Sequence, residues 1–158
     1  QAQAIDDFED PAFKQLLTDM QQLMEEANGV GIAAPQIGAS RQALIIASRP
    51  TSRYPHAPLM AATVICNPQF QVINPTRIKD WEGCLSVPGI RALVPRYQAI
   101  SVSYQDASGK ACQMNLEDFP ARVFQHEFDH LQGLVYLDRV ENNADIIAES
   151  EYFKRLAS

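Results

Sequence analysis

The motif His126-Glu127-Phe128-Asp129-His130 constrains the fold of this chain more than any other segment. Two histidines four positions apart lie on the same face of a helix, so both imidazoles can reach one metal ion. The glutamate between them then lies beside the open coordination position, where water binds in hydrolytic sites. We therefore predict a helix from about Pro120 to Gln132 that carries a metal site for hydrolysis.

The bulk composition indicates one globular domain spanning residues 1–158. The chain is 46% hydrophobic and 20% charged, with a net charge of −6, which argues against a nucleic-acid-binding surface. No apolar run is long enough to cross a membrane, and residues 1–7 lack the basic and apolar regions of a signal peptide. Three cysteines do not suggest a disulfide framework, so we expect a reducing, cytoplasmic setting.

Helices are predicted at both ends of the chain and short strands in its middle. Asp10-Pro11 starts a first helix that Asn28-Gly29 ends, and Asn143 is predicted to cap a last helix through Ile146, Ile147 and Phe153. The predicted strands are 43–47, 63–66, 70–73, 99–104 and 110–116, with a proline-rich surface loop at 48–60. This arrangement predicts an α+β fold with a mostly antiparallel sheet.

The third metal ligand is not settled by spacing. Catalytic zinc-type sites have three protein ligands, and the position of a third histidine in metzincins is occupied here by Tyr136. Thermolysin-like enzymes use a downstream glutamate, and this chain offers Glu141, Glu149 and Glu151. Cys84 is the better candidate because thiolates bind divalent transition metals strongly, although a single cysteine is as well explained as a small buried hydrophobe.

Three segments, in this order, resemble the peptide deformylase family. They are Gly29-Val30-Gly31-Ile32-Ala33-Ala34-Pro35-Gln36-Ile37-Gly38, then Glu82-Gly83-Cys84-Leu85-Ser86, then Gln125 to Leu131 continuing through Gly133 to Asp138-Arg139. The resemblance covers roughly Gly29 to Val140, and it implies a sheet packed around a central helix that carries the metal motif. Family members begin with a longer stretch that includes an initial strand, so we expect this N-terminal segment to be short or missing here.

The resemblance implies a metal-dependent hydrolase. Cys84, His126 and His130 would bind one divalent ion, Fe²⁺ in the cell, with Zn²⁺, Ni²⁺ or Co²⁺ as substitutes. The substrates would be N-formylmethionyl nascent peptides, from which the enzyme removes the formyl group and releases formate. The metal-bound water would attack the formyl carbon, with Glu127 as general base and then general acid.

The family pattern also implies the groups around the reacting carbon. The Gln36 side-chain amide and the Leu85 backbone N–H would donate to the oxyanion. The peptide would run as an added strand near Gly31 and Gly89. Val123 and Phe124 are candidates for the methionine pocket, although apolar helix residues are more often core.

Three charged residues are predicted to support the ligands. Glu82 could form an ion pair with Arg91 or Arg96 that braces the Cys84 segment. Asp129 could orient a neighbouring group, and a solvated helix carboxylate is nearly as good an explanation.

Two other functions are compatible with the metal motif. An ordinary metallopeptidase would take its third ligand from downstream and would not need Cys84. A non-catalytic relic that binds ribosomes or nascent chains would be expected to lose Glu127 or Gln36, and both are present. The sequence leaves a transient ribosome contact open, and it is compatible with bacterial cytoplasm, an organelle or a phage-infected cell.

Overall fold

In the described part of the chain, residues 1–52 and 54–158, one sheet of six antiparallel strands organises the computed structural model. The strands are Gly31–Ala33 (β1), Ala43–Ser48 (β2), Met60–Cys84 (β3), Val87–Gln105 (β4), Ala111–Glu117 (β5) and Ile146–Ala148 (β6). They are hydrogen-bonded in the order β1-β2-β3-β4-β5, and β6 pairs with β4. The predicted α+β fold with an antiparallel sheet is confirmed.

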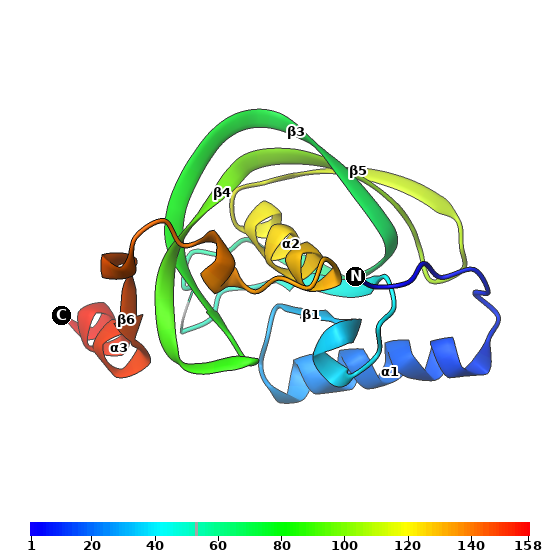
Figure 1. The fold of residues 1–158 in the computed structure, drawn as a ribbon, viewed down its shortest axis with the longest axis horizontal. Coiled ribbons are helices and arrows are strands. Elements are labelled where there is room, and N and C mark those ends of the chain that lie inside the picture. Colours follow the sequence, from blue (N-terminus) through cyan, green and yellow to red (C-terminus); the bar gives the residue numbers. More distant parts are fainter. Residues whose placement is uncertain (53) are drawn as a thin grey trace.

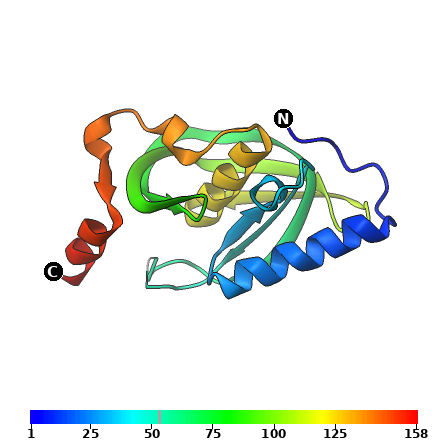
Figure 2. The ribbon, with the colours of Figure 1, turned by 60° about the horizontal axis from the view of Figure 1, so that its bottom comes forward.

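Three α-helices lie against this sheet: Pro11–Glu26 (α1), Asp118–Leu131 (α2) and Glu149–Ala157 (α3). Shorter 3₁₀ turns occupy Ala34–Ile37, Tyr136–Arg139 and Asn143–Asp145. Figure 1 shows α2 in the hollow formed by β3, β4 and β5, as the predicted central helix should lie. Figure 2 shows α1 and α3 at different ends of the molecule.

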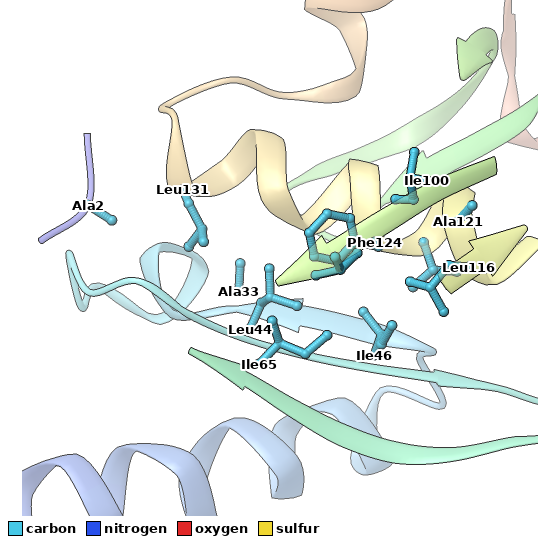
Figure 3. Packing of buried hydrophobic residues seen from close by; sticks show 12 residues of the cluster. Ala2, Ala33, Leu44, Ile46, Ile65, Ile100, Leu116, Ala121, Phe124 and Leu131 are labelled. Carbon is cyan, nitrogen blue, oxygen red and sulfur yellow. The ribbon is translucent and has the colours of Figure 1, made fainter. Parts of the chain in front are cut away.

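The residues of β2 explain why helices cover both faces of the sheet. All six side chains are buried, and successive strand residues point to opposite faces. Leu44 and Ile46 therefore join the core beneath α2, whereas Ala43 and Ile45 join the core beneath α1. Figure 3 shows Leu44 and Ile46 directed toward Phe124 of α2. This core fixes the helix that carries the metal motif against the sheet.

The long β3–β4 hairpin replaces two short predicted strands. We expected strands at 63–66 and 70–73 to be separated at Asn67-Pro68, but β3 continues from Met60 to Cys84. Asn67 adopts a left-handed conformation, with φ of 49°, and the pairing with β4 shifts between Cys66 and Gln69. The break in the pattern therefore marks a bulge rather than a strand end. Bulges let the hairpin curve around α2 (Figure 1). The end of β3 thereby brings Cys84 close to His126 and His130 of α2.

The C-terminal region differs from the prediction. Ile146 and Ile147 form β6 on the edge of β4, and the last helix begins only at Glu149. Asn142, rather than Asn143, caps the preceding 3₁₀ turn by accepting from the Ala144 backbone. The last helix exists and contains Phe153, but its predicted start was wrong because two isoleucines suit a strand edge as well as a helix face.

The predicted loop 48–60 corresponds to the connection between β2, which ends at Ser48, and β3, which begins at Met60. Arg53 within it lies outside the described residues. Among the described residues, no helix has the length and apolar character needed to span a bilayer.

Candidate metal centre

The end of β3 and the middle of α2 bring Cys84, His126 and His130 together. Their potential ligand atoms all lie within 4.8 Å of one another. His126 and His130 stand one helical turn apart on α2, with ring centroids 5.2 Å apart, and Cys84 Sγ is 3.5 Å from His130 Nε2. The structure thus groups the predicted cysteine with the predicted histidine pair.

The surroundings of His126 fit a metal ligand. Its Nδ1 is 2.9 Å from Glu82 Oε1, so a proton on Nδ1 is held by this carboxylate. That hydrogen bond leaves Nε2 as the ring atom with a free lone pair, which is the usual arrangement of metal-binding histidines. One sulfur and two imidazole nitrogens suit a divalent transition metal and provide three of four tetrahedral positions.

Glu82 anchors a buried ion network behind the site. Arg96 donates to both of its carboxylate oxygens, at 2.9 and 3.0 Å, and Arg122 donates to Oε2 at 2.6 Å. Burial alone would raise the pKa of Glu82, but Arg96 and His126 hold it well below its usual range. Of the two arginines considered from sequence, Arg96 is the partner of Glu82, whereas Arg91 donates to Tyr54 and Glu149.

Asp129 belongs to the same network and is not a solvated carboxylate. It is 3% exposed, and its Oδ2 accepts from Arg96 Nη1 at 2.7 Å. Arg139 also donates to Asp129, at 2.8 and 3.1 Å. Arg96 therefore links the carboxylates of β3 and α2, which fixes the helix carrying both histidines relative to the strand that ends at Cys84.

Unlike Glu82 and Asp129, Glu127 is not part of the ion network. Its side chain is buried, but Oε2 has no hydrogen-bond partner among the described residues. Burial raises the pKa of Glu127 to about 7. Gly31 explains how the carboxylate fits, because a Cβ at this position would lie 2.7 Å from Glu127 Oε1.

Gln36 and Leu85 approach the site from two separate loops. Gln36 Nε2 lies 3.6 Å from Cys84 Sγ, and its Oε1 accepts from the Ala33 backbone N–H at 2.8 Å. Leu85 follows Cys84 in the hairpin turn and has a side chain that is 62% exposed. Both residues line the cavity described next, so the predicted donors lie beside the ligand group.

A cavity lies beside the candidate metal centre and is lined by two of the three candidate ligands, Cys84 and His126. Its lining includes the polar side chains of Gln36 and Glu127. It also includes the apolar or aromatic side chains of Val30, Tyr54, Phe119 and Val123. The Tyr54 and Phe119 rings pack with centroids 4.6 Å apart. The cavity can therefore hold an apolar side chain next to a reactive polar centre.

Val123 lines this cavity as predicted, but Phe124 does not. Phe124 is fully buried and packs against Phe70 and Phe128 in the core between α2 and the sheet (Figure 3). Adjacent helix residues point about 100° apart, and the side chain of Phe124 is the one directed into the core. Gly89 has φ of +86° and lies in β4, but it is not among the cavity-lining residues.

The downstream glutamates of the metallopeptidase alternative are engaged elsewhere. Each forms an ion pair away from the histidines: Glu141 with Arg77 and Lys79, Glu149 with Arg91, and Glu151 with Lys154. Within the described residues, the third member of the candidate metal-binding group is Cys84. No carboxylate or histidine downstream of His130 belongs to this group.

Sequence reasoning missed two residues of the site. Arg122 is buried beneath the cavity, where it donates to Glu82 and to the carbonyls of Ile78 and Val94. Tyr54 comes from the proline-rich loop that we had placed at the surface. The position of Arg122 one turn before His126 could have indicated it, whereas nothing local distinguishes Tyr54.

Comparison with known proteins agrees with this geometry. The family model described as "Polypeptide deformylase" matches residues 1–145. Peptide deformylase 2 of Nostoc sp. is 50% identical over 148 residues, covering 94% of this chain and 83% of that protein. Peptide deformylase 1 of Bordetella pertussis is 43% identical over 141 residues, covering 89% and 80%.

Solved structures give the same result. A class I type b peptide deformylase from Acinetobacter baumannii with Met-Ala-Ser bound superimposes with a TM-score of 0.85. It is 40% identical, and the match covers 88% of this chain and 89% of that one. With a matching family model, close relatives and the Cys-His-His group in place, the chain belongs to the peptide deformylase family.

Proposed function

We propose that this protein removes the formyl group from N-formylmethionyl peptides and releases formate. The observation that carries the proposal is the unpartnered carboxylate of Glu127, buried beside the group of Cys84, His126 and His130. A site that only held metal would not need a buried carboxylate without a partner, because its desolvation is costly. Family membership supports the same reaction.

Cys84, His126 and His130 would hold the metal, which when bound supplies the Lewis acidity that makes water a nucleophile near neutral pH. Glu127 accepts a proton from the attacking water and delivers it to the amine nitrogen as the carbon–nitrogen bond breaks. Gln36 Nε2 and the Leu85 backbone N–H stabilise the negative charge that develops on the formyl oxygen. The products are formate and a peptide with a free N-terminus.

The position of the cavity supports methionine as the first residue. Its apolar lining residues, which include Val123 and Phe119, would contact the methionine side chain. Gly31 lies in β1, which pairs with β2 and forms the edge of the sheet order. The peptide backbone would add to this edge as a further strand, with Gly89 on the opposite side. Met-Ala-Ser is bound to the Acinetobacter baumannii relative, which supports such a substrate.

We propose Fe²⁺ as the ion used in the cell, with Zn²⁺, Ni²⁺ or Co²⁺ as substitutes, because a sulfur and two imidazoles accommodate all four. Peroxide should inactivate the iron-loaded protein faster than the zinc-loaded protein, since iron adds a redox-active centre next to the Cys84 thiol. Residual activity and the mass of the Cys84 peptide would be measured over time for both forms. Equal decay of the two forms would contradict iron-centred damage.

We propose that residues 1–158 act as one catalytic domain on nascent chains, in a bacterial-type cytoplasm where formylated peptides are made. Transient contact with the ribosome would follow from such a substrate. Co-sedimentation with translating and empty ribosomes would test it, and equal absence from both pellets would contradict it.

The test of the main proposal is formate release from formyl-Met-Ala-Ser by anaerobically prepared, iron-loaded protein. Acetyl-Met-Ala-Ser serves as the control, because the extra methyl group should not fit beside Gln36 and Leu85. Release from the formyl peptide alone, abolished in Cys84→Ala, would support both the reaction and the ligand. Cleavage of internal peptide bonds without formate would favour a metallopeptidase, and metal binding without any reaction would favour a non-catalytic protein.

A further inference from the structure

The Gln36 amide is held at both of its ends. A glutamine amide has one acceptor oxygen and two N–H donors, and its terminal torsion is loosely restricted. The backbone N–H of Ala33 donates to Gln36 Oε1 at 2.8 Å, which turns Nε2 toward the hairpin that ends β3. Gln36 lies in the 3₁₀ turn Ala34–Ile37, so this contact closes within a single short loop.

Ser86 makes the contact at the other end. Its Oγ accepts from Gln36 Nε2 at 3.2 Å, although the two residues are 50 positions apart in sequence. Ser86 and Leu85 form the turn between Cys84 and Val87, which are paired across the hairpin. The backbone N–H of Ser86 also hydrogen-bonds to Cys84. One residue therefore contacts both the candidate ligand and the candidate oxyanion donor.

We propose that Ser86 is a positioning residue that fixes the orientation of the Gln36 amide, an inference that rests on the proposed deformylation. Gln36 Nε2 donates to Ser86 Oγ at 3.2 Å and lies 3.6 Å from Cys84 Sγ, so the amide nitrogen is held beside the candidate ligand, where the formyl oxygen would bind. A donor that is already oriented stabilises developing charge without reorganisation during the reaction. Without the hydroxyl, the amide keeps its contacts with the Ala33 N–H and with Cys84 Sγ but loses one of its three restraints, so the direction of its N–H donors is less sharply fixed.

The effect should be on turnover rather than on binding. Loss of one neutral hydrogen bond corresponds to a decrease in kcat of about 3- to 10-fold in Ser86→Ala, with KM changed by less than about 2-fold. Ser86→Thr retains the hydroxyl and should keep kcat within about 2-fold of the parent protein. Ser103→Ala, at an exposed position toward the far end of β4, is the matched control and should have no effect.

A double-mutant cycle separates this role from a general disturbance of the turn. If Ser86 acts through Gln36, then adding Ser86→Ala to Gln36→Ala should leave kcat unchanged. The same 3- to 10-fold loss in the Gln36→Ala background would overturn the proposal, because Ser86 would then act through Cys84 or the hairpin. All variants would be compared at equal metal content.

A second measurement does not depend on activity. In the zinc-loaded protein, the ¹⁵N-labelled Gln36 side-chain amide gives two proton signals, which are assigned from their absence in Gln36→Ala. Ser86→Ala should shift these signals and reduce the difference between them, whereas Ser86→Thr should preserve it. Unchanged signals in Ser86→Ala would overturn the contact. If the parent protein releases no formate, the proposed reaction fails, while the amide signals still decide whether Ser86 holds Gln36.

Discussion

Two glutamates near the candidate metal ligands, Glu82 and Glu127, have the same side chain and almost the same burial, at 3% and 4% exposure. Glu82 accepts from Arg96, Arg122 and His126, and these contacts keep its pKa low despite burial. Glu127 has a buried oxygen without a partner, and burial raises its pKa to about 7. Partners, rather than depth, therefore distinguish a carboxylate that holds the site from one that can exchange protons.

The network around Glu82 also explains why charges are tolerated in this core. Replacing a buried ion pair with apolar residues is often neutral or stabilising, so the pairs with Arg96 and Arg122 are a weak argument for stability. Their evident consequence is geometric, because they join β3 to α2 and orient the ring of His126. Glu82 and Glu127 both line the cavity, but Glu127 Oε2 has no hydrogen-bond partner among the described residues.

The largest expected effect is the loss of turnover when Glu127 is replaced. Glu127→Gln should lower kcat by about 10²- to 10⁴-fold, because the amide cannot accept and return the proton. The free energy of unfolding should stay the same or increase, since a buried carboxylate without a partner is removed. Formate release and urea unfolding would be measured together. Retained turnover would remove Glu127 from its proposed role and would break the contrast with Glu82.

The next largest expected effect is the loss of stability when Glu82, the centre of the ion network, is replaced. Glu82→Gln should lower the free energy of unfolding by about 3–5 kcal/mol, because buried Arg122 loses its counter-charge and Arg96 keeps only its pair with Asp129. Glu141→Gln is the matched control: this glutamate is exposed and pairs with Arg77 and Lys79, so its loss should cost no more than about 1 kcal/mol. Urea unfolding measures both, and equal stability of the two variants would show that the network is not coupled to folding.

The smallest effect comes from crowding Glu127 without changing its charge. A Cβ at Gly31 would lie 2.7 Å from Glu127 Oε1, and the carboxylate would have to move. Gly31→Ala should therefore lower kcat by about 10-fold, as expected when a catalytic group is slightly misplaced, with little loss of stability. Gly29→Ala is the control, since its Cβ would meet ordinary contacts at 3.5 Å or more. Equal kcat in the two variants would show that the position of Glu127 is not critical.

The site residues that could be predicted from sequence are those that lie close together along the chain. His126 and His130 are four residues apart on one helix, which fixes their relation before any tertiary structure is known. The assignment of Cys84 as the third ligand needed the family resemblance, because spacing left a buried structural cysteine equally acceptable. The structure then brings the three groups within 4.8 Å.

The parts that could not be predicted depend on tertiary contacts. Arg122 lies on a helix surrounded on most sides by protein, so a residue that would ordinarily face solvent is instead buried against Glu82. Tyr54 reaches the cavity through contacts with Phe119 and the Trp81 carbonyl, both distant in sequence. Ile146 and Ile147 formed a strand because an edge of β4 was open to them.

Our central claim is that Glu82 supports the metal ligands while Glu127 exchanges protons. The most direct test is to measure bound iron per chain in Glu127→Gln and Glu82→Gln, prepared and dialysed identically. We expect Glu127→Gln to retain iron as the parent protein does. Glu82→Gln should bind iron about 10- to 100-fold more weakly, because His126 loses the carboxylate that orients its ring. Iron lost from Glu127→Gln but retained by Glu82→Gln would reverse the two roles and contradict the account.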